Sequence, residues 1–142
     1  MTTEQFIKKF MSCSLIPYWN DNKELAIGYN QTINVTSASL WTQKQADSDL
    51  HKRIAITTSL IHSKVANASK FSANQMTALV SLFLDIGYED IRRTKFMEYL
   101  ETKNYVMISS SFMLFNKTKR NVVSVKKTAR RKAEQTLFNS KD

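Results

Sequence analysis

The sequence of 142 residues contains one cysteine, one proline and two glycines. A single thiol, Cys13, cannot form an internal disulfide, and with only two histidines beside it no cysteine–histidine zinc site can be assembled. The shortage of glycine and proline leaves few residues for the tight turns of an all-β sandwich or for a glycine-rich phosphate loop. We therefore expect helix to dominate, and we expect no metal site and no cofactor.

Long apolar runs are also missing. No stretch approaches the roughly 18 consecutive apolar residues that a membrane-spanning helix needs, and the first ten residues lack the pattern of a signal peptide. Apolar residues make up 42% and charged residues 23% of the chain, as is typical of a soluble globular protein. These features predict a single domain over residues 1–142, synthesised in the cytoplasm and without a transmembrane segment.

Positive charge exceeds negative charge in the chain as a whole. The sequence has 21 Lys and Arg against 12 Asp and Glu, a net charge of +9, and residues 116–132 hold eight basic residues and no acidic one. Within this segment Lys126, Lys127, Arg130 and Arg131 form the candidate basic surface. It is interpreted either as a solvated face or as a contact for an anionic partner. Nucleic acid is the less favoured partner, because few aromatic residues accompany the basic ones.

The first third of the chain predicts a small β-lobe, residues 1–41. A short N-terminal helix ends near Ser12, and two apolar segments, 15–18 and 25–29, flank the polar cluster 20–23, a pattern typical of a hairpin. Gly28 is expected to mark a close backbone approach or a bulge. The segment 33–35 allows a third short strand.

The remainder, residues 42–142, predicts a larger helical lobe. Two capping boxes, Thr42 with Gln45 and Ser72 with Gln75, predict the starts of a long amphipathic helix over 42–65 and of a buried helix that ends before Gly87. Apolar spacing predicts further helices over 90–102, 105–115 and 125–138. The fold class is therefore α+β and predominantly α, with a long helix joining the two lobes.

Three segments in the right order resemble one known family. They are Phe10-Met-Ser-Cys-Ser-Leu-Ile-Pro-Tyr-Trp-Asn20 followed by Ala26-Ile-Gly-Tyr-Asn-Gln-Thr32, then Met76-Thr-Ala-Leu-Val-Ser-Leu-Phe-Leu-Asp-Ile-Gly87, and Ala129-Arg-Arg-Lys-Ala-Glu-Gln-Thr-Leu-Phe138. The set is similar to the bacteriophage lysozyme or endolysin family, glycoside hydrolase family 24. The resemblance implies a lysozyme-like fold and peptidoglycan as substrate. Arg130 and Arg131 match the family's paired arginines, which implies a structural role in ion pairs.

The chain departs from the family pattern at the positions that carry the chemistry. Met11 stands where the resemblance implies the catalytic glutamate, Asn20 where it implies the second carboxylate, and Ala26 where it implies the threonine that orients water. Gln31 replaces the histidine after the second strand. We expect Met11, Asn20, Ala26 and Gln31 to line one cleft between the lobes, with no catalytic residue among them.

Glycoside hydrolysis needs one protonated and one ionised carboxyl group beside the scissile bond. Met11 cannot titrate and Asn20 cannot ionise, so the matched site lacks both groups. We expect the triple change Met11→Glu, Asn20→Asp and Ala26→Thr to lower the melting temperature. The new carboxyl group at position 11 would lie in a partly apolar pocket, and its burial destabilises the protein unless a basic group forms an ion pair with it. Another carboxyl group could serve as an unconventional acid. The candidates are Glu4, if the alignment with the family pattern is shifted along the chain, and Asp21 and Glu24 near the hairpin tip.

The predicted function is therefore that of a catalytically silent, lysozyme-like protein that acts as a binding or structural component. Its expected setting is a virion, a tail or the cell wall, and its expected partner is peptidoglycan or a phage or host protein. The alternative is an active endolysin, a muramidase that hydrolyses peptidoglycan with unconventional acid residues. The expected location is the host cytoplasm at synthesis, followed by association with the virion or release to the cell wall.

Overall fold

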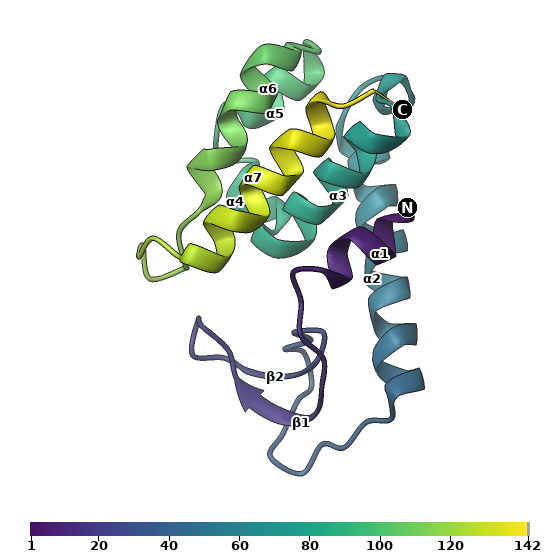
Figure 1. Ribbon diagram of the computed structural model, residues 1–142, viewed down its shortest axis with the longest axis vertical. Helices are drawn as coiled ribbons and strands as arrows, with labels where there is room; N and C mark the ends of the chain where they lie inside the picture. Colours follow the sequence, from purple (N-terminus) through teal and green to yellow (C-terminus); the bar gives the residue numbers. More distant parts are fainter. Residues whose placement is uncertain (142) are drawn as a thin grey trace.

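A two-stranded hairpin and a helical bundle lie at opposite ends of the long helix α2 in the computed structural model, which describes residues 1–141 (Figure 1). The elements in chain order are α1 (Thr3–Lys8), β1 (Ser14–Trp19), β2 (Leu25–Gly28), α2 (Gln43–Lys64), the 3₁₀ helix η1 (Ala68–Lys70), α3 (Ala73–Ile86), α4 (Tyr88–Ile91), α5 (Phe96–Glu101), α6 (Tyr105–Ser111), the 3₁₀ helix η2 (Phe112–Phe115) and α7 (Val125–Asn139). This arrangement is the α+β fold with two lobes that the sequence predicts.

The hairpin is antiparallel and irregular in the middle. Tyr18 pairs with Ala26 and Ser14 with Gly28, and the register shifts between these pairs. Pro17 lies within the shifted stretch and cannot donate a hydrogen bond to the neighbouring strand. The third strand allowed over 33–35 is wrong: Asn34 has a φ of 58°, a left-handed conformation that ends any extended run.

The predicted helix starts are confirmed. The side-chain oxygens of Thr42 and Ser72 each accept a hydrogen bond from the backbone amide three residues later, and the side chains of Gln45 and Gln75 accept one from the backbone amide of the capping residue. Thr2 and Gln5 form a third capping box at the start of α1. The N-terminal helix ends at Lys8, a few residues before the expected position.

Two predicted helices are shorter than expected. The segment 90–102 is divided into α4 and α5, because the Thr94 hydroxyl donates to the Ile91 carbonyl and accepts from the Phe96 amide, which interrupts the helical ladder. The segment 105–115 changes from α-helix to 3₁₀ helix at Phe112. The last predicted helix agrees with α7.

The core lies in the helical lobe, where α3 is buried on most of its surface between α2 and α7 (Figure 1). Aromatic rings from α5, η2 and α7 pack against one another in this core: the ring centroids of Phe112 and Phe138 are 5.7 Å apart, and those of Phe96 and Phe112 are 5.8 Å apart. Aromatic pairs of this kind stabilise a core beyond the apolar area they bury. Among residues 1–141 no helix has both the length and the hydropathy that crossing a bilayer requires.

Candidate functional site

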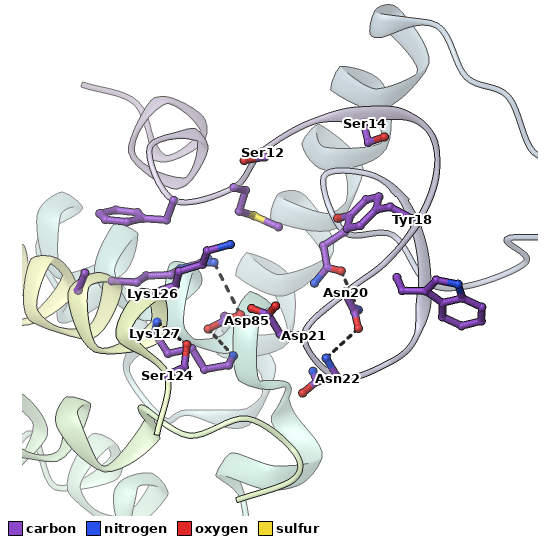
Figure 2. Close-up of a pocket in the computed structure, with 16 residues that line it drawn as sticks. Ser12, Ser14, Tyr18, Asn20, Asp21, Asn22, Asp85, Ser124, Lys126 and Lys127 are labelled. Carbon is purple, nitrogen blue, oxygen red and sulfur yellow. Dashed lines mark hydrogen bonds and ion pairs between the residues drawn. The ribbon is translucent and has the colours of Figure 1, made fainter. Parts of the chain in front are cut away.

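A cavity of about 690 Å³ lies where the hairpin lobe faces the ends of α3 and α7. Figure 2 shows Tyr18, Asn20 and Asp21 on the hairpin side, and Asp85, Lys126 and Lys127 on the helical side. We call this cavity the interlobe pocket. Its lining is Phe10, Met11, Ser12, Ser14, Tyr18, Trp19, Asn20, Asp21, Asn22, Asn30, Asp85, Ser124, Lys126, Lys127, Ala129 and Arg130. Amides, hydroxyls, aromatic rings and charged groups thus surround one concave space, as is common in ligand sites.

Asn20 lines the interlobe pocket, and its side chain also organises the hairpin tip. Its Oδ1 accepts hydrogen bonds from the backbone amides of Asn22 and Glu24, each at 2.9 Å. Its Nδ2 donates to Oδ1 of Asn30 at 2.9 Å and to a Glu24 carboxylate oxygen at 3.5 Å. The uncharged amide at position 20 is therefore a local structural element of the turn.

Two of the four expected cleft residues lie elsewhere. Met11 and Asn20 belong to the pocket lining, whereas Ala26 is completely buried and Gln31 lies against α2. Gln31 donates from Nε2 to Asp49 at 2.9 Å and accepts from the Ile33 amide at 2.9 Å. The expectation of one shared cleft is corrected for Ala26 and Gln31, because β2 and the following turn direct these side chains away from the pocket.

The candidate basic surface also needs correction. Lys126 is exposed, but Arg130 is 4% exposed and Arg131 is fully buried. The side chains of both arginines lie between α3 and α7 and form ion pairs there. They therefore have the structural role in ion pairs that the family resemblance implies. We call the group Asp85, Lys127, Arg130, Arg131 and Glu134 the charge cluster.

Asp85 holds three cations of the charge cluster together. Its carboxylate lies 3.0 Å from Nζ of Lys127, 3.0 Å from Nη1 of Arg131 and 3.7 Å from Nη1 of Arg130. Burial alone would raise the pKa of Asp85, but the charges of Arg130, Arg131 and Lys127 bring it below its ordinary value. Asp85 is therefore ionised at neutral pH.

Glu134 closes the other side of the charge cluster. Its carboxylate lies 2.6 Å from Nε of Arg131 and 3.4 Å from Nε of Arg130, and it accepts a hydrogen bond from the Ser81 hydroxyl. Burial raises the pKa of Glu134 against the opposing effect of the two arginines. Because Glu134 is fully buried and is not part of the pocket lining, it has no access to a ligand there.

The other candidate acids do not reach the interlobe pocket, with one exception. Glu4 and Glu24 are absent from its lining, and Glu24 instead pairs with Lys119 at 3.4 Å. Asp21 does line the pocket and is exposed. Cys13 also lies outside the lining, and its thiol contacts Oε1 of Gln43.

Sequence reasoning missed Asp85 as a pocket residue. A signal was present, because Asp85 is the one charged residue of α3. Basic residues of α7 complement it, and they also line the pocket beside Met11.

The fold and the interlobe pocket define the class of protein, a two-lobed lysozyme-like domain. The profile of the phage lysozyme family matches residues 8–134, and the chain belongs to that family. An endolysin of Acyrthosiphon pisum secondary endosymbiont phage 1 is 29% identical in an alignment of 140 positions that covers 94% of this chain and 92% of that protein.

Solved structures share the fold. The muramidase domain of SpmX from Asticaccaulis excentricus superposes with a TM-score of 0.84 at 20% identity, over 98% of this chain and 95% of that one. The endolysin of the Escherichia coli O157:H7 phage FAHEc1 gives 0.83 at 21% identity, over 97% and 90% of the two chains. At this level of identity the likeness establishes the lysozyme-like architecture.

Proposed function

We propose that this member of the phage lysozyme family binds the glycan strands of peptidoglycan in the interlobe pocket without cleaving them. The observation that carries the proposal is the state of the pocket's carboxyl groups. Met11 and Asn20 are uncharged, and of the two carboxylates in the lining Asp85 is fixed in ion pairs while Asp21 is exposed.

A glycosidase acid must hold a proton near neutral pH, which requires a raised pKa. The pKa of Asp85 is lowered by the cations around it, so this carboxyl group has no proton to give. Loss of general acid help alone reduces a rate by about 10²–10⁴-fold. The polar lining that remains, with amides at Asn20, Asn22 and Asn30, supports binding of a polar sugar chain.

The biological setting proposed for this binding is a virion, a tail or the cell wall, where a lysozyme-like domain attaches a particle or a partner protein to peptidoglycan. Family membership supports peptidoglycan as the ligand. The net charge of +9 favours association with the anionic wall.

A second candidate function is an active endolysin. Two observations favour it: the relative with 29% identity is named an endolysin, and Asp21 and Asp85 both line the interlobe pocket. In this interpretation Asp21 takes the catalytic role, because it is the exposed carboxylate of the two.

The two functions are separated by assays on purified peptidoglycan. We expect the protein to sediment with peptidoglycan sacculi and to give neither turbidity loss nor a zymogram band between about pH 4 and pH 8. Turbidity loss that disappears in Asp21→Asn, Glu4→Ala or Glu24→Ala would establish the endolysin function and identify its acid. A protein that neither binds nor cleaves sacculi would overturn both candidates.

A further inference from the structure

Three exposed valines lie close together at the start of α7. Val122, Val123 and Val125 are between 60% and 85% exposed, although valine is among the residue types that are most often buried. An apolar residue just before a helix cap commonly packs on an apolar residue at the fourth helical position, but here Val123 precedes the cap and the fourth position is Thr128. The start of the helix therefore does not explain why Val123 is apolar.

Backbone hydrogen bonds order the loop that presents two of these valines. The Thr118 amide donates to the Val122 carbonyl at 2.8 Å, and Lys117 and Val123 form an antiparallel bridge. Residues that pair directly across such a bridge direct their side chains to the same face, so Lys117 and Val123 lie side by side. The loop projects from the helical lobe, at the left of Figure 1. It presents these side chains on a convex tip rather than in a groove.

Positive charge without an ion-pair partner accompanies the valines. Of the eight basic residues in the segment 116–132, Lys119 pairs with Glu24 and three belong to the charge cluster. Lys119 also shares a second cavity with Glu89 and Asp90, so acidic groups lie around it. The other four basic residues are exposed and form no ion pair within residues 1–141: Lys117, Arg120, Lys126 and Lys132.

We call Val122, Val123, Val125, Lys117 and Arg120 the valine surface. Exposed apolar side chains beside basic ones are typical of surfaces that meet anionic lipid, because phosphates attract the cations and the acyl-chain boundary accepts the apolar groups. A bilayer is flat on the scale of a loop, which suits a convex tip. Nucleic acid offers phosphates but no apolar layer for the valines, and a neutral bilayer offers the layer without the counterions.

We infer that the valine surface docks this protein on the face of an anionic lipid bilayer. The valines lie at the boundary of the acyl chains, and Lys117 and Arg120 meet lipid phosphates. This docking goes beyond the proposed function, because no residue of the valine surface lines the interlobe pocket.

Vesicle flotation tests the inference with the whole chain. One set of vesicles contains equal parts of phosphatidylglycerol and phosphatidylcholine, and the other contains phosphatidylcholine alone. We expect the protein to float with the anionic vesicles and to remain in solution with the neutral ones, because each cation near an anionic surface contributes about fivefold in affinity. Added salt should weaken the binding, since it screens the charges. Failure to float with the anionic vesicles would overturn the inference.

Matched variants separate the valine surface from the overall composition of the chain. Val123→Ser and Lys117→Ala should each weaken binding to anionic vesicles by about fivefold. The controls lie on α2, on the other side of the helical lobe in Figure 1: Ile56→Ser removes an exposed apolar side chain and Lys52→Ala an exposed lysine. The controls should change binding by less than about twofold. Equal losses in the controls would overturn the inference.

A fluorescent reporter gives a second, independent readout of the contact. Lipids brominated on the acyl chain should quench the emission added by Val123→Trp but not that added by Ile56→Trp, after subtraction of the parent signal from Trp19 and Trp41. Equal quenching of the two reporters would show that the valine surface does not enter the bilayer and would overturn the inference.

Two further measurements assign the ligand and separate this inference from the proposed function. Binding of a DNA duplex that Val123→Ser weakens as much as vesicle binding would overturn the assignment to lipid. Sedimentation of Val123→Ser and Lys117→Ala with peptidoglycan sacculi should equal that of the parent, because both residues lie outside the interlobe pocket. Loss of vesicle binding with intact sacculus binding, or the reverse, identifies which of the two proposals fails.

Discussion

The Asn20 side chain has a structural role at a position where the family resemblance implies a carboxylate. Its Oδ1 accepts two backbone hydrogen bonds that an aspartate could also accept. Its Nδ2 donates to Asn30 and to Glu24, which an aspartate cannot do. The amide is thus specified by the turn in which it lies.

Asn20→Asp is expected to lower the free energy of unfolding by about 1–2 kcal/mol, because the two hydrogen bonds that Nδ2 donates are lost and a carboxylate comes close to that of Glu24. Asn22→Asp is the matched control, since Asn22 uses its Oδ1 to accept from the Lys119 amide and aspartate keeps that acceptor. Urea unfolding of both variants measures the difference. An Asn20→Asp variant as stable as the parent would contradict the role assigned to the amide.

Asp85 illustrates the opposite case, a buried charge that its surroundings require. Asp85→Asn leaves Lys127, Arg130 and Arg131 without their shared carboxylate and should cost about 3 kcal/mol or more at pH 7. The pKa of Asp85 is lowered in the folded protein, so its stabilisation is complete above the unfolded value, near 3.9, and disappears as the pH falls through the lower folded value.

The difference in stability between the parent and Asp85→Asn should therefore shrink as the pH is lowered below about 4. Chemical unfolding at pH 7 and at successively lower pH measures it. Asp21→Asn serves as control, because Asp21 is exposed and makes no ion pair in the described part of the chain. A difference that stays constant with pH would show that Asp85 stabilises the fold through packing rather than charge.

At the scale of the secondary-structure elements, two glycines end two elements under different constraints. Gly28 at the end of β2 has a φ of 65°, and a Cβ there would lie 2.7 Å from a ring carbon of Trp41. Gly87 after α3 has a φ of 92°, and a Cβ there would meet nothing within 4 Å. Both need backbone freedom, but only Gly28 also needs the absence of a side chain.

Gly28→Ala should therefore destabilise the protein more than Gly87→Ala. We expect about 1 kcal/mol for Gly87→Ala from backbone strain alone, and an additional 1–3 kcal/mol, approximately, for Gly28→Ala from the clash with Trp41. Thermal unfolding followed by circular dichroism, with both variants measured under the same conditions, provides the comparison. Equal losses would mean that Trp41 moves aside without cost.

At the scale of the whole molecule, the two lobes differ in how they are held. The helical lobe contains the aromatic clusters and the buried middle of α3, whereas the hairpin lobe has one short two-stranded sheet. A contact between the lobes runs from the hairpin tip to the loop before α7, where the Lys119 amide donates to Asn22 and Lys119 pairs with Glu24. Lys119 is largely exposed and Glu24 partly exposed, so the pair contributes little to stability.

Native-state hydrogen exchange should therefore distinguish the lobes. Amides of α3 and α7 are expected to exchange only through global unfolding, and those of β1 and β2 through local opening at a lower free energy. Exchange measured by NMR at several low concentrations of denaturant separates the two classes. Equal opening free energies in both lobes would show that the lobes unfold as one unit.

The sequence alone determined the features that depend on neighbouring residues. The capping boxes at Thr42 and Ser72 predicted where α2 and α3 begin, because a cap involves residues three apart, and the scarcity of glycine and proline predicted a mostly helical fold. Only the tertiary structure decided which side chains meet across the chain. It buried Arg130 and Arg131 against Asp85, turned Ala26 and Gln31 away from the pocket, and brought Lys126 to it, since those contacts depend on how α3, α7 and the hairpin pack.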